Sequence, residues 1–583
     1  MLNFTRIQRH LLIRLVAVAG LCFSTGTTFL HAQEPIGFAR AVVAADHREA
    51  SAAGLEMLRQ GGNVVDAAVA TAFALAVVRP ASCGLGGGGF MVIWDARKQQ
   101  CIAIDYREQA PAAATRDMYI DPDNPRTVRP DASEHGGLAV AVPGHVAGLC
   151  LALKRYGTLD LPTVLAPALR LCREGVLIDA HDLAVQKDVL KNYAKHPDYA
   201  SRFAALRRLY VNEGKPWTSR DLFYSPLGEV LNRIATHGPE GFYTGEVGSA
   251  LVNEVQRNGG ILTLADLSAV KPVVRETLSA KLGNETIYTM PPPSSGGVAL
   301  LETLQILQAL ATAHPQAGLD QLSPESPQFL HLLTESFKQA FADRATFLGD
   351  ADFVQVPVAR LTSVDYAARM ALKVNLEQTR PSEAYGRSTT PDDGGTSHFS
   401  VLDAEGNAVA CTETINTEFG SYLVEPRFGI VLNNEMDDFT GLPGVPNAFG
   451  LLQSEANSIS AGKRPLSSMT PTIVVRDGKA QYVVGASGGP RIITATAQVL
   501  LRMQRFGQSC PDAVNAPRLH HQWAPEWLDH EAGLQATVTA LERFGHKPRL
   551  RNGGAVVQAC RRLPDGRVEA ASDRRKGGVP AGF

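Results

Sequence analysis

The sequence predicts a layered α+β fold. Three observations support this expectation: residues 150–380 carry a largely helical pattern, the residues after 395 turn to strand patterns, and the two do not follow strict βαβ alternation. The last point favours stacked layers over a doubly wound sheet. The composition agrees, because 583 residues with 45% hydrophobic and 20% charged side chains can bury a large core.

The first 32 residues have the features of a secretory signal peptide. Arg6, Arg9 and Arg14 form a basic stretch, an apolar run from Leu15 to Phe23 follows, and Ala32 is the candidate cleavage point. A helix needs about 20 apolar residues to span a bilayer. The run is shorter than that, so we expect no stable membrane anchor.

Residues 48–78 predict two helices separated by a break at residues 61–63, the second being Ala/Val-rich and buried. The residues that follow, Gly84-x-Gly86-x-x-Gly89, formally match a dinucleotide-binding fingerprint. That fingerprint follows a strand and opens a helix, whereas this one follows a helix and opens a strand at 91–94. It therefore predicts a close-packed turn.

The second half of the chain carries the strand patterns. Residues 380–395 predict an exposed loop, because they are rich in Pro, Ser, Thr, Asp and Gly. Strands are expected at 399–402 and 408–414 around a turn at 403–407, then as a pair at 429–433 and 472–475, and at 481–484. A helix is predicted at 492–506.

Charge and cysteine content exclude several classes of partner. The net charge is −2, and without residues 1–32 it becomes −5, from 53 basic and 58 acidic residues. With no basic excess to neutralise phosphates, a nucleic-acid partner is not expected. Seven of eight Cys remain in the mature chain without a Cys-x-x-Cys motif, which predicts scattered core thiols. We predict no metal site and no cofactor.

One candidate nucleophile is Ser487, in the Gly-x-Ser-x-Gly motif at 485–489 between a predicted strand and a predicted helix. Downstream residues in the order of a serine-hydrolase triad are Asp529, His530 and His546. In the alternative interpretation, Gly488 and Gly489 supply backbone N–H groups. They precede Pro490, a favourable first helical residue, so these groups can stabilise an oxyanion without any attack by Ser487.

A second candidate is Thr396, in the loop-to-strand junction Gly394-Gly395-Thr396-Ser397-His398. A Thr hydroxyl becomes a good nucleophile when the residue is the first of its chain, because its own α-amine then serves as the base. Such an N-terminus arises if the Thr396 hydroxyl attacks the preceding carbonyl and the resulting ester hydrolyses. Gly395 suits this step because it tolerates strained backbone. His398 falls on the same strand face as Thr396, but we expect it to be structural.

Several longer motifs resemble the γ-glutamyltransferase family (γ-glutamyltranspeptidase, or glutathione hydrolase) of N-terminal-nucleophile hydrolases. The likeness runs from about Ile36 to Phe583 and is carried by Gly394-Gly-Thr-Ser-His-Phe-Ser400, Asn433-Asn-Glu-Met-Asp-Asp-Phe439, Lys463-Arg-Pro-Leu-Ser-Ser-Met469 and Gly485-Ala-Ser-Gly-Gly489, with shorter blocks at 84–90, 103–111, 291–297 and 516–523. It implies a four-layer αββα sandwich built from both products of self-cleavage. Those products would be a large subunit, 33–395, and a small subunit, 396–583, associated as a heterodimer.

The resemblance also implies roles for individual residues. Thr396 is the nucleophile, and Thr414 would hydrogen-bond its hydroxyl or amine. Arg107, Ser467 and Ser468 would bind the α-carboxylate of a γ-glutamyl donor. Asn416, Glu435 and Asp438 would hold its α-ammonium; Glu435 stands where some relatives carry Gln. Gly488 and Gly489 would stabilise the oxyanion.

The expected reaction transfers a γ-glutamyl group from glutathione or related amides to water, amino acids or peptides. Three alternatives remain at this point: a cephalosporin or glutaryl acylase of the same family, a Ser487 esterase, and a secreted binding protein with a relic site. The acylases need not hold an α-ammonium, so Asp438 favours the glutamyl substrate. The signal peptide and a single mature sequon, at Asn284, predict a bacterial periplasmic or secreted protein. Residues 439–462 resemble a lid loop found in some relatives.

Overall fold

The computed structural model describes residues 37–385, 395–445, 447–551 and 553–583. The expected signal peptide and most of the expected 380–395 loop lie outside these ranges. The residues from Gly37 onward form one compact unit.

Seven antiparallel strands form the first sheet, in the order β20-β1-β11-β12-β2-β3-β8. The candidate nucleophile, Thr396, directly precedes β11 of this sheet. The strands are β1 (Ala41–Ala45), β2 (Gly88–Asp95), β3 (Gln100–Asp105), β8 (Val273–Arg275), β11 (Ser397–Asp403), β12 (Ala408–Thr414) and β20 (Ala581–Gly582).

Six strands form the second sheet, in the order β19-β18-β14-β13-β10-β9. They are β9 (Leu278–Leu282), β10 (Glu285–Thr289), β13 (Thr472–Arg476), β14 (Lys479–Ser487), β18 (Val556–Arg562) and β19 (Val568–Ser572). Across the interface between the sheets, β11 contacts both β14 and β18. Gly489, just after the end of β14, lines one cavity together with Thr396, just before β11.

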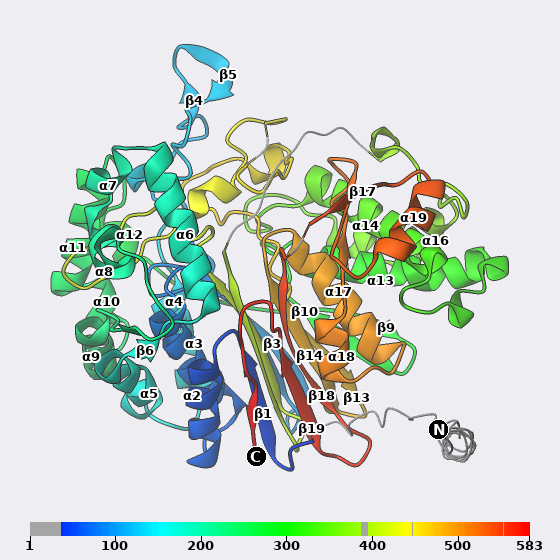
Figure 1. Ribbon diagram of the computed structural model, residues 1–583, viewed down its shortest axis with the longest axis horizontal. Coiled ribbons are helices and arrows are strands. Elements are labelled where there is room, and N and C mark those ends of the chain that lie inside the picture. The colour runs from blue at the N-terminus through cyan, green and yellow to red at the C-terminus, as the bar shows by residue number, and fades with distance from the viewer. Residues whose placement is uncertain (1–36, 386–394, 446, 552) are drawn as a thin grey trace, which may run out of the picture. The chain divides into compact units, whose positions relative to one another are not determined.

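Strand alternation explains why the first sheet is buried on both faces. Along β1, Val43 and Ala45 join the core formed with the first helices, whereas Val42 and Ala44 join the core shared with the second sheet. Figure 1 shows the sheets between two groups of helices. On one side lie α2 (Arg48–Arg59), α3 (Val64–Val78), α4 (His145–Tyr156) and α5 (Leu161–Glu174); on the other lie α13 (Gly296–Ala313), α14 (Pro327–Phe347), α17 (Arg491–Gln504) and α18 (Cys510–Asn515).

The remaining elements lie around this centre. The helices are α6 (Ala180–Lys195), α7 (Tyr199–Arg202), α8 (Ala204–Tyr210), α9 (Gly228–His237), α10 (Glu240–Tyr243), α11 (Gly245–Arg257), α12 (Leu264–Ser268), α15 (Val358–Leu361), α16 (Val364–Ala371) and α19 (Gln535–Arg543). Short strands are β4 (Ile120–Asp121), β5 (Asn124–Val128), β6 (Val176–Leu177), β7 (Leu222–Phe223), β15 (Leu519–His520), β16 (Trp527–His530) and β17 (Lys547–Leu550).

The two apolar helices are core elements. Asn63 and Asp66 form a reciprocal capping box that starts α3, and every residue of α3 is buried, as the sequence predicts. Among the described residues, α13 is the one helix long and apolar enough to cross a membrane. Of its residues, 72% are buried inside the structure, as in the core helix of a folded domain.

The glycine run 84–89 forms the predicted close-packed turn between α3 and β2. A Cβ at Gly86 would lie 2.0 Å from the carbonyl oxygen of Val431, and one at Gly87 would lie 2.0 Å from that of Thr414. Side chains are therefore excluded at both positions. This turn packs against the end of β12, where Thr414 lies.

One expectation about local structure is wrong. Residues 429–433 do not pair with 472–475; β13 pairs with β10 and β14, while Val431 and Leu432 make isolated bridges to Val424 and Gly86. This apolar stretch is buried by wrapping around the glycine turn. Of the expected loop at 380–395, the structure describes residues 380–385 and 395; they include a short 3₁₀ helix, Ser382–Ala384, whose Ser382 is buried through hydrogen bonds to Trp523 and Glu526.

Candidate active site

Thr396 and Thr414 lie opposite each other where β11 begins and β12 ends. Ser397 pairs with Glu413 in the strand register, which brings the two threonines together. The Thr396 hydroxyl lies 3.3 Å from that of Thr414 and donates to the carbonyl oxygen of Gly395 at 2.6 Å. Hairpin register thus places a hydroxyl beside the peptide bond expected to break.

Hydrogen-bond direction assigns a donor role to Thr414. Its hydroxyl oxygen accepts the backbone N–H of Asn416 at 2.7 Å, so its proton is available for Thr396 or for the carbonyl oxygen of Gly395, 3.3 Å away. Asn416 adopts a left-handed backbone with φ of 77°, which Asn tolerates better than most residues. Its side-chain amide donates to the carbonyl oxygen of Asn434 at 3.0 Å.

His398 does not serve as the base for Thr396. Its ring nitrogens bind the hydroxyls of Thr412 and Ser400 at 2.8 and 3.2 Å. Burial lowers the pKa of His398 to about 3. The imidazole is therefore a neutral structural group, as the sequence predicts, and leaves the role of base to another group.

Lys576 is a neighbour of Thr396 that sequence reasoning missed. Its buried ammonium donates to the carbonyl oxygen of Thr396 and to Asp46 Oδ2, both at 2.8 Å. This contact fixes the first peptide of β11. The lysine lies 180 residues from Thr396 in the sequence, and no local motif signals the contact.

Arg107, Glu435 and Asp438 form one buried ionic cluster. Arg107 follows β3, and both acids lie on the 3₁₀ helix Glu435–Asp438. Arg107 Nη1 is 2.6 Å from Glu435 Oε2, and Nη2 contacts Asp438 Oδ2. The expected ligand of a carboxylate and the expected ligands of an ammonium thus neutralise each other, and a donor substrate would have to exchange these pairs.

Burial and charge act against each other in this cluster. For Arg107, burial disfavours the charged form, but Glu435 and Asp438 outweigh it and hold the pKa above its usual value. Burial raises the pKa of Glu435 well above its usual value and also raises that of Asp438, with Arg107 opposing in both. Burial likewise raises the pKa of the adjacent Glu108 to about 8. Three acids, Glu108, Glu435 and Asp438, thus surround one guanidinium, and this excess of acidic groups favours the binding of a further cation.

Gly488 and Gly489 lie between the end of β14 and the start of α17. Their φ angles are 121° and 53°, values that favour glycine. A Cβ at Gly488 would lie 2.1 Å from the carbonyl oxygen of Gly554. The N–H groups at the start of a helix lack intrahelical acceptors, so this turn is suited to bind an oxyanion.

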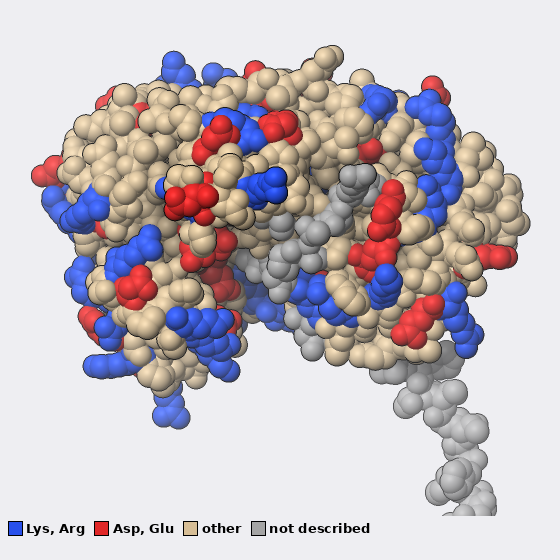
Figure 2. Space-filling view, turned by 90° about the horizontal axis from the view of Figure 1, so that it is seen from above, with Lys and Arg blue, Asp and Glu red and all other residues tan. Residues whose placement is uncertain are grey.

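One cavity brings most of the expected site residues together. Phe449 and Leu451, from the expected lid loop, also line it. The expected residues among its lining are Arg107, Thr396, Thr414, Asn416, Asp438, Ser467, Ser468 and Gly489. Glu435 and Gly488 are not among its lining residues, although Glu435 contacts Arg107, which is. Figure 2 shows one face of the molecule, on which Lys and Arg side chains are interspersed with Asp and Glu side chains.

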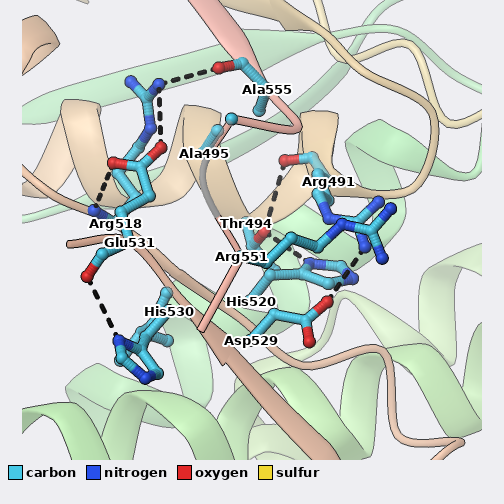
Figure 3. Close-up of a pocket in the computed structure, with 12 residues that line it drawn as sticks. Arg491, Thr494, Ala495, Arg518, His520, Asp529, His530, Glu531, Arg551 and Ala555 are labelled. Atoms are coloured by element: carbon cyan, nitrogen blue, oxygen red, sulfur yellow. Dashed lines mark hydrogen bonds and ion pairs between the residues drawn. The ribbon is translucent and has the colours of Figure 1, made fainter. Parts of the chain in front are cut away.

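The residues of the alternative esterase triad have other partners. Figure 3 shows a neighbouring cavity in which Asp529 pairs with Arg491 at 2.9 Å and His530 binds the carbonyl oxygen of Glu531 at 3.1 Å. His546 instead binds His331 at 2.8 Å. Among the described residues, Ser487 makes no hydrogen bond to any of these three groups, so the structure does not assemble a serine-hydrolase triad.

Within the described ranges, His331, Glu335 and His546 are close enough to hold a metal ion. Hydrogen bonds account for the burial of these side chains, so a metal ion is not needed to explain it. His546 binds His331, which binds the carbonyl oxygen of Asn375 at 2.8 Å. Glu335 accepts from Thr379 and Tyr385, both at 2.5 Å. The seven cysteines of the described chain are unpaired and buried or half-buried, as expected.

Comparison with known proteins defines the class. Residues 50–583 match the family model described as Gamma-glutamyltranspeptidase. The chain therefore belongs to the gamma-glutamyltranspeptidase family, which confirms the resemblance seen in its motifs.

Individual relatives agree. The glutathione hydrolase proenzyme of Escherichia coli (strain K12) is 40% identical over 547 residues, covering 93% of this chain and 91% of that protein. The crystal structure of Helicobacter pylori gamma-glutamyltranspeptidase is 36% identical and covers 58% of this chain and 92% of that chain, with a TM-score of 0.52. A cephalosporin acylase from Bacillus halodurans, 24% identical, covers 96% of this chain and 98% of that chain with a TM-score of 0.82, and shows the fold alone.

Proposed function

We propose that this protein is a γ-glutamyltransferase and glutathione hydrolase that uses Thr396 as an N-terminal nucleophile. The observation that carries the proposal is the cavity in which a Thr hydroxyl meets an arginine, an acid, two serines and the turn at Gly489. The glutathione hydrolase name of a relative at 40% identity supports the same activity.

Maturation would follow from the geometry at the junction. The Thr396 hydroxyl attacks the carbonyl carbon of Gly395 and the C–N bond breaks, which leaves an ester. Thr414 is positioned to donate to the carbonyl oxygen as it gains negative charge. Water then hydrolyses the ester to a Gly395 carboxylate and a free Thr396 α-amine.

The two products would be a large subunit, 33–395, and a small subunit, 396–583, preceded by a signal peptide at 1–32. Strands from both share each sheet: β1 pairs with β11, and β10 pairs with β13. This supports a stable heterodimer in a four-layer αββα arrangement of the N-terminal-nucleophile type. We infer a periplasmic or secreted location from the signal peptide.

Donor binding would use the two halves of the ionic cluster. The α-carboxylate would be bound by Arg107, Ser467 and Ser468, and the α-ammonium by Asp438, Glu435 and Asn416. An amino-acid zwitterion can replace the internal pairs because it brings one charge of each sign. This arrangement favours a γ-glutamyl donor over an acyl group without an ammonium, such as glutaryl.

Catalysis would proceed through an acyl-Thr intermediate. The α-amine takes the hydroxyl proton as Thr396 Oγ1 attacks the γ-carbonyl carbon, and the N–H groups of Gly488 and Gly489 stabilise the oxyanion. Collapse expels the amine product, which takes the proton. Water, an amino acid or a peptide then attacks the ester. No cofactor is required for these steps.

The decisive test compares two anilides with the purified mature protein. γ-Glutamyl anilide carries both α-groups, whereas glutaryl anilide lacks the ammonium. We expect much higher kcat/KM for the γ-glutamyl compound, and release of glutamate from glutathione. A preference for glutaryl anilide would instead establish an acylase, and activity on neither would contradict the proposal.

A further inference from the structure

Arg344 is a buried cation behind the donor cavity. It lies on α14 with 1% of its surface exposed. Burying a charge is costly unless an opposite charge lies close by. Other buried arginines follow this rule: Arg79 contacts Asp179 and Asp182, and Arg518 contacts Asp573.

Arg344 departs from the rule in the part of the chain that the structure describes, where no carboxylate forms an ion pair with it. Its Nη1 is buried and has no hydrogen-bond partner there. Burial lowers the pKa of Arg344 to about 10, with the nearby Asp438 opposing. By contrast, the charge of Arg107 is already balanced by two acids.

The hydrogen bonds that Arg344 makes have a fixed direction, because a guanidinium can donate and cannot accept. Nη2 lies 3.4 Å from Ser468 Oγ, so the oxygen accepts and the Ser468 proton is left to donate elsewhere. Nε donates to Ser295 Oγ at 2.9 Å, and Ser295 in turn donates to the carbonyl oxygen of Ser467 at 2.6 Å. One arginine thus holds the backbone and sets the hydroxyl direction of the Ser467–Ser468 segment.

We propose that Arg344 is a positioning residue for the α-carboxylate of the donor: it turns the Ser468 hydroxyl into a donor toward the cavity and supplies the positive charge that the carboxylate neutralises. The inference rests on the proposed γ-glutamyl activity and extends its substrate recognition to a residue outside the cavity wall. Ser468 lines that cavity and Arg344 lies directly behind it.

The test uses donors that differ in one α-group. γ-Glutamyl anilide carries both groups, glutaryl anilide keeps the carboxylate, and 4-aminobutyryl anilide keeps the ammonium. We expect Arg344→Met to lower kcat/KM about 10- to 100-fold for the two donors with a carboxylate, the range of a hydrogen bond to a charged group. Its effect on 4-aminobutyryl anilide should be at least several-fold smaller. Where turnover is too slow to measure, the inhibition constants of the same compounds replace it.

A matched control is Lys338→Met, which removes another buried cation from α14. Its ammonium contacts Thr379 and Arg380, away from the serines. Any loss in this variant should be equal for the three donors. Gel analysis of subunit formation and thermal melting establish that each variant is folded and cut.

If Arg344→Met fails to fold, Arg344→Lys is tested in its place. Lysine keeps the positive charge but lacks the planar set of guanidinium N–H donors. It should discriminate between the donors in the same direction but by a smaller factor. An equal loss on all three donors in a folded Arg344 variant would overturn the inference while the proposed function stands. Wild-type protein inactive on γ-glutamyl anilide would overturn both.

Discussion

Arg107 is the residue whose environment differs most from a simple binding role, because it forms ion pairs with the acids that should hold the other end of the substrate. Breaking a buried pair leaves its partner uncompensated. Substituting Arg107 therefore costs free energy in two ways: a contact with the substrate is lost, and a buried ion pair is broken.

We expect Arg107→Ala and Asp438→Ala each to raise KM for γ-glutamyl anilide, at a cost of about 2–5 kcal/mol, because each removes a charged hydrogen bond in a closed site. The double variant should lose less than the sum of the two, since its members contact each other. Steady-state kinetics on the three variants measures this coupling. Unchanged KM in both single variants would remove these residues from the donor site.

Glu435 gives a prediction about pH. Burial raises its pKa well above the usual value, with Arg107 opposing, so the carboxyl is neutral below that raised pKa and ionised above it. A neutral carboxyl attracts the donor's ammonium less, and KM should therefore rise as pH falls. Glu435→Gln cannot ionise and should flatten this acid-side dependence.

The matched control is Glu425→Gln, which alters a buried acid that binds the N–H groups of Arg427 and Phe428. It should leave the pH profile of KM unchanged. Identical profiles in wild-type and Glu435→Gln protein would show that Glu435 does not act on the substrate.

Residues within contiguous motifs could be predicted from the sequence, and residues that reach the site by packing could not. Thr396, Ser467, Ser468 and Gly489 all belong to motifs and all line the cavity. Lys576 and Arg344 come from distant elements, and their roles depend on which backbone carbonyl or hydroxyl they meet after folding. The residues around Lys576 and Arg344 in the sequence form no pattern that predicts these contacts.

At the scale of elements, the site is the meeting point of the ends of strands. Thr396 directly precedes β11, β12 ends at Thr414, and β14 ends just before Gly488 and Gly489. The hairpin and the helix after the turn were predictable, because turn residues and periodicity are local. The segment 429–433 was not, because an apolar extended stretch is buried equally well by a sheet or by wrapping around a glycine turn.

The turn between β14 and α17 has its own prediction. Gly489 has φ of 53°, a region that a β-branched side chain enters at a cost of about 1–2 kcal/mol. Gly489→Val should displace its N–H group and lower kcat about 100-fold or more, the scale of losing one oxyanion donor. Kinetics of p-nitroanilide release measures this.

Gly507→Val is the control, because Gly507 has a similar φ of 65° and open space around it. It imposes comparable backbone strain away from the cavity and should keep full kcat with a similar fall in melting temperature. Equal kcat in Gly489→Val and Gly507→Val would contradict the oxyanion role of this turn.

At the scale of the whole molecule, the prediction is that the chain cuts itself between Gly395 and Thr396. The products should have masses of about 39 kDa and about 20 kDa, and the small one should begin Thr-Ser-His-Phe. They should remain associated in native conditions, because strands from both sides of the cut pair within each sheet. Denaturing gels, native size determination and N-terminal sequencing test these statements.

Thr396→Ala removes the attacking hydroxyl, so it should leave one uncut and inactive chain. Thr396→Ser keeps a hydroxyl and should be cut, at a lower rate. His398→Gln is the matched control, since His398 is a structural partner of Thr412 and Ser400; a folded variant should still be cut. A fully active wild-type chain that is never cut would refute the mechanism, because an internal Thr396 has no free amine to act as its base, and no other base contacts its hydroxyl among the described residues.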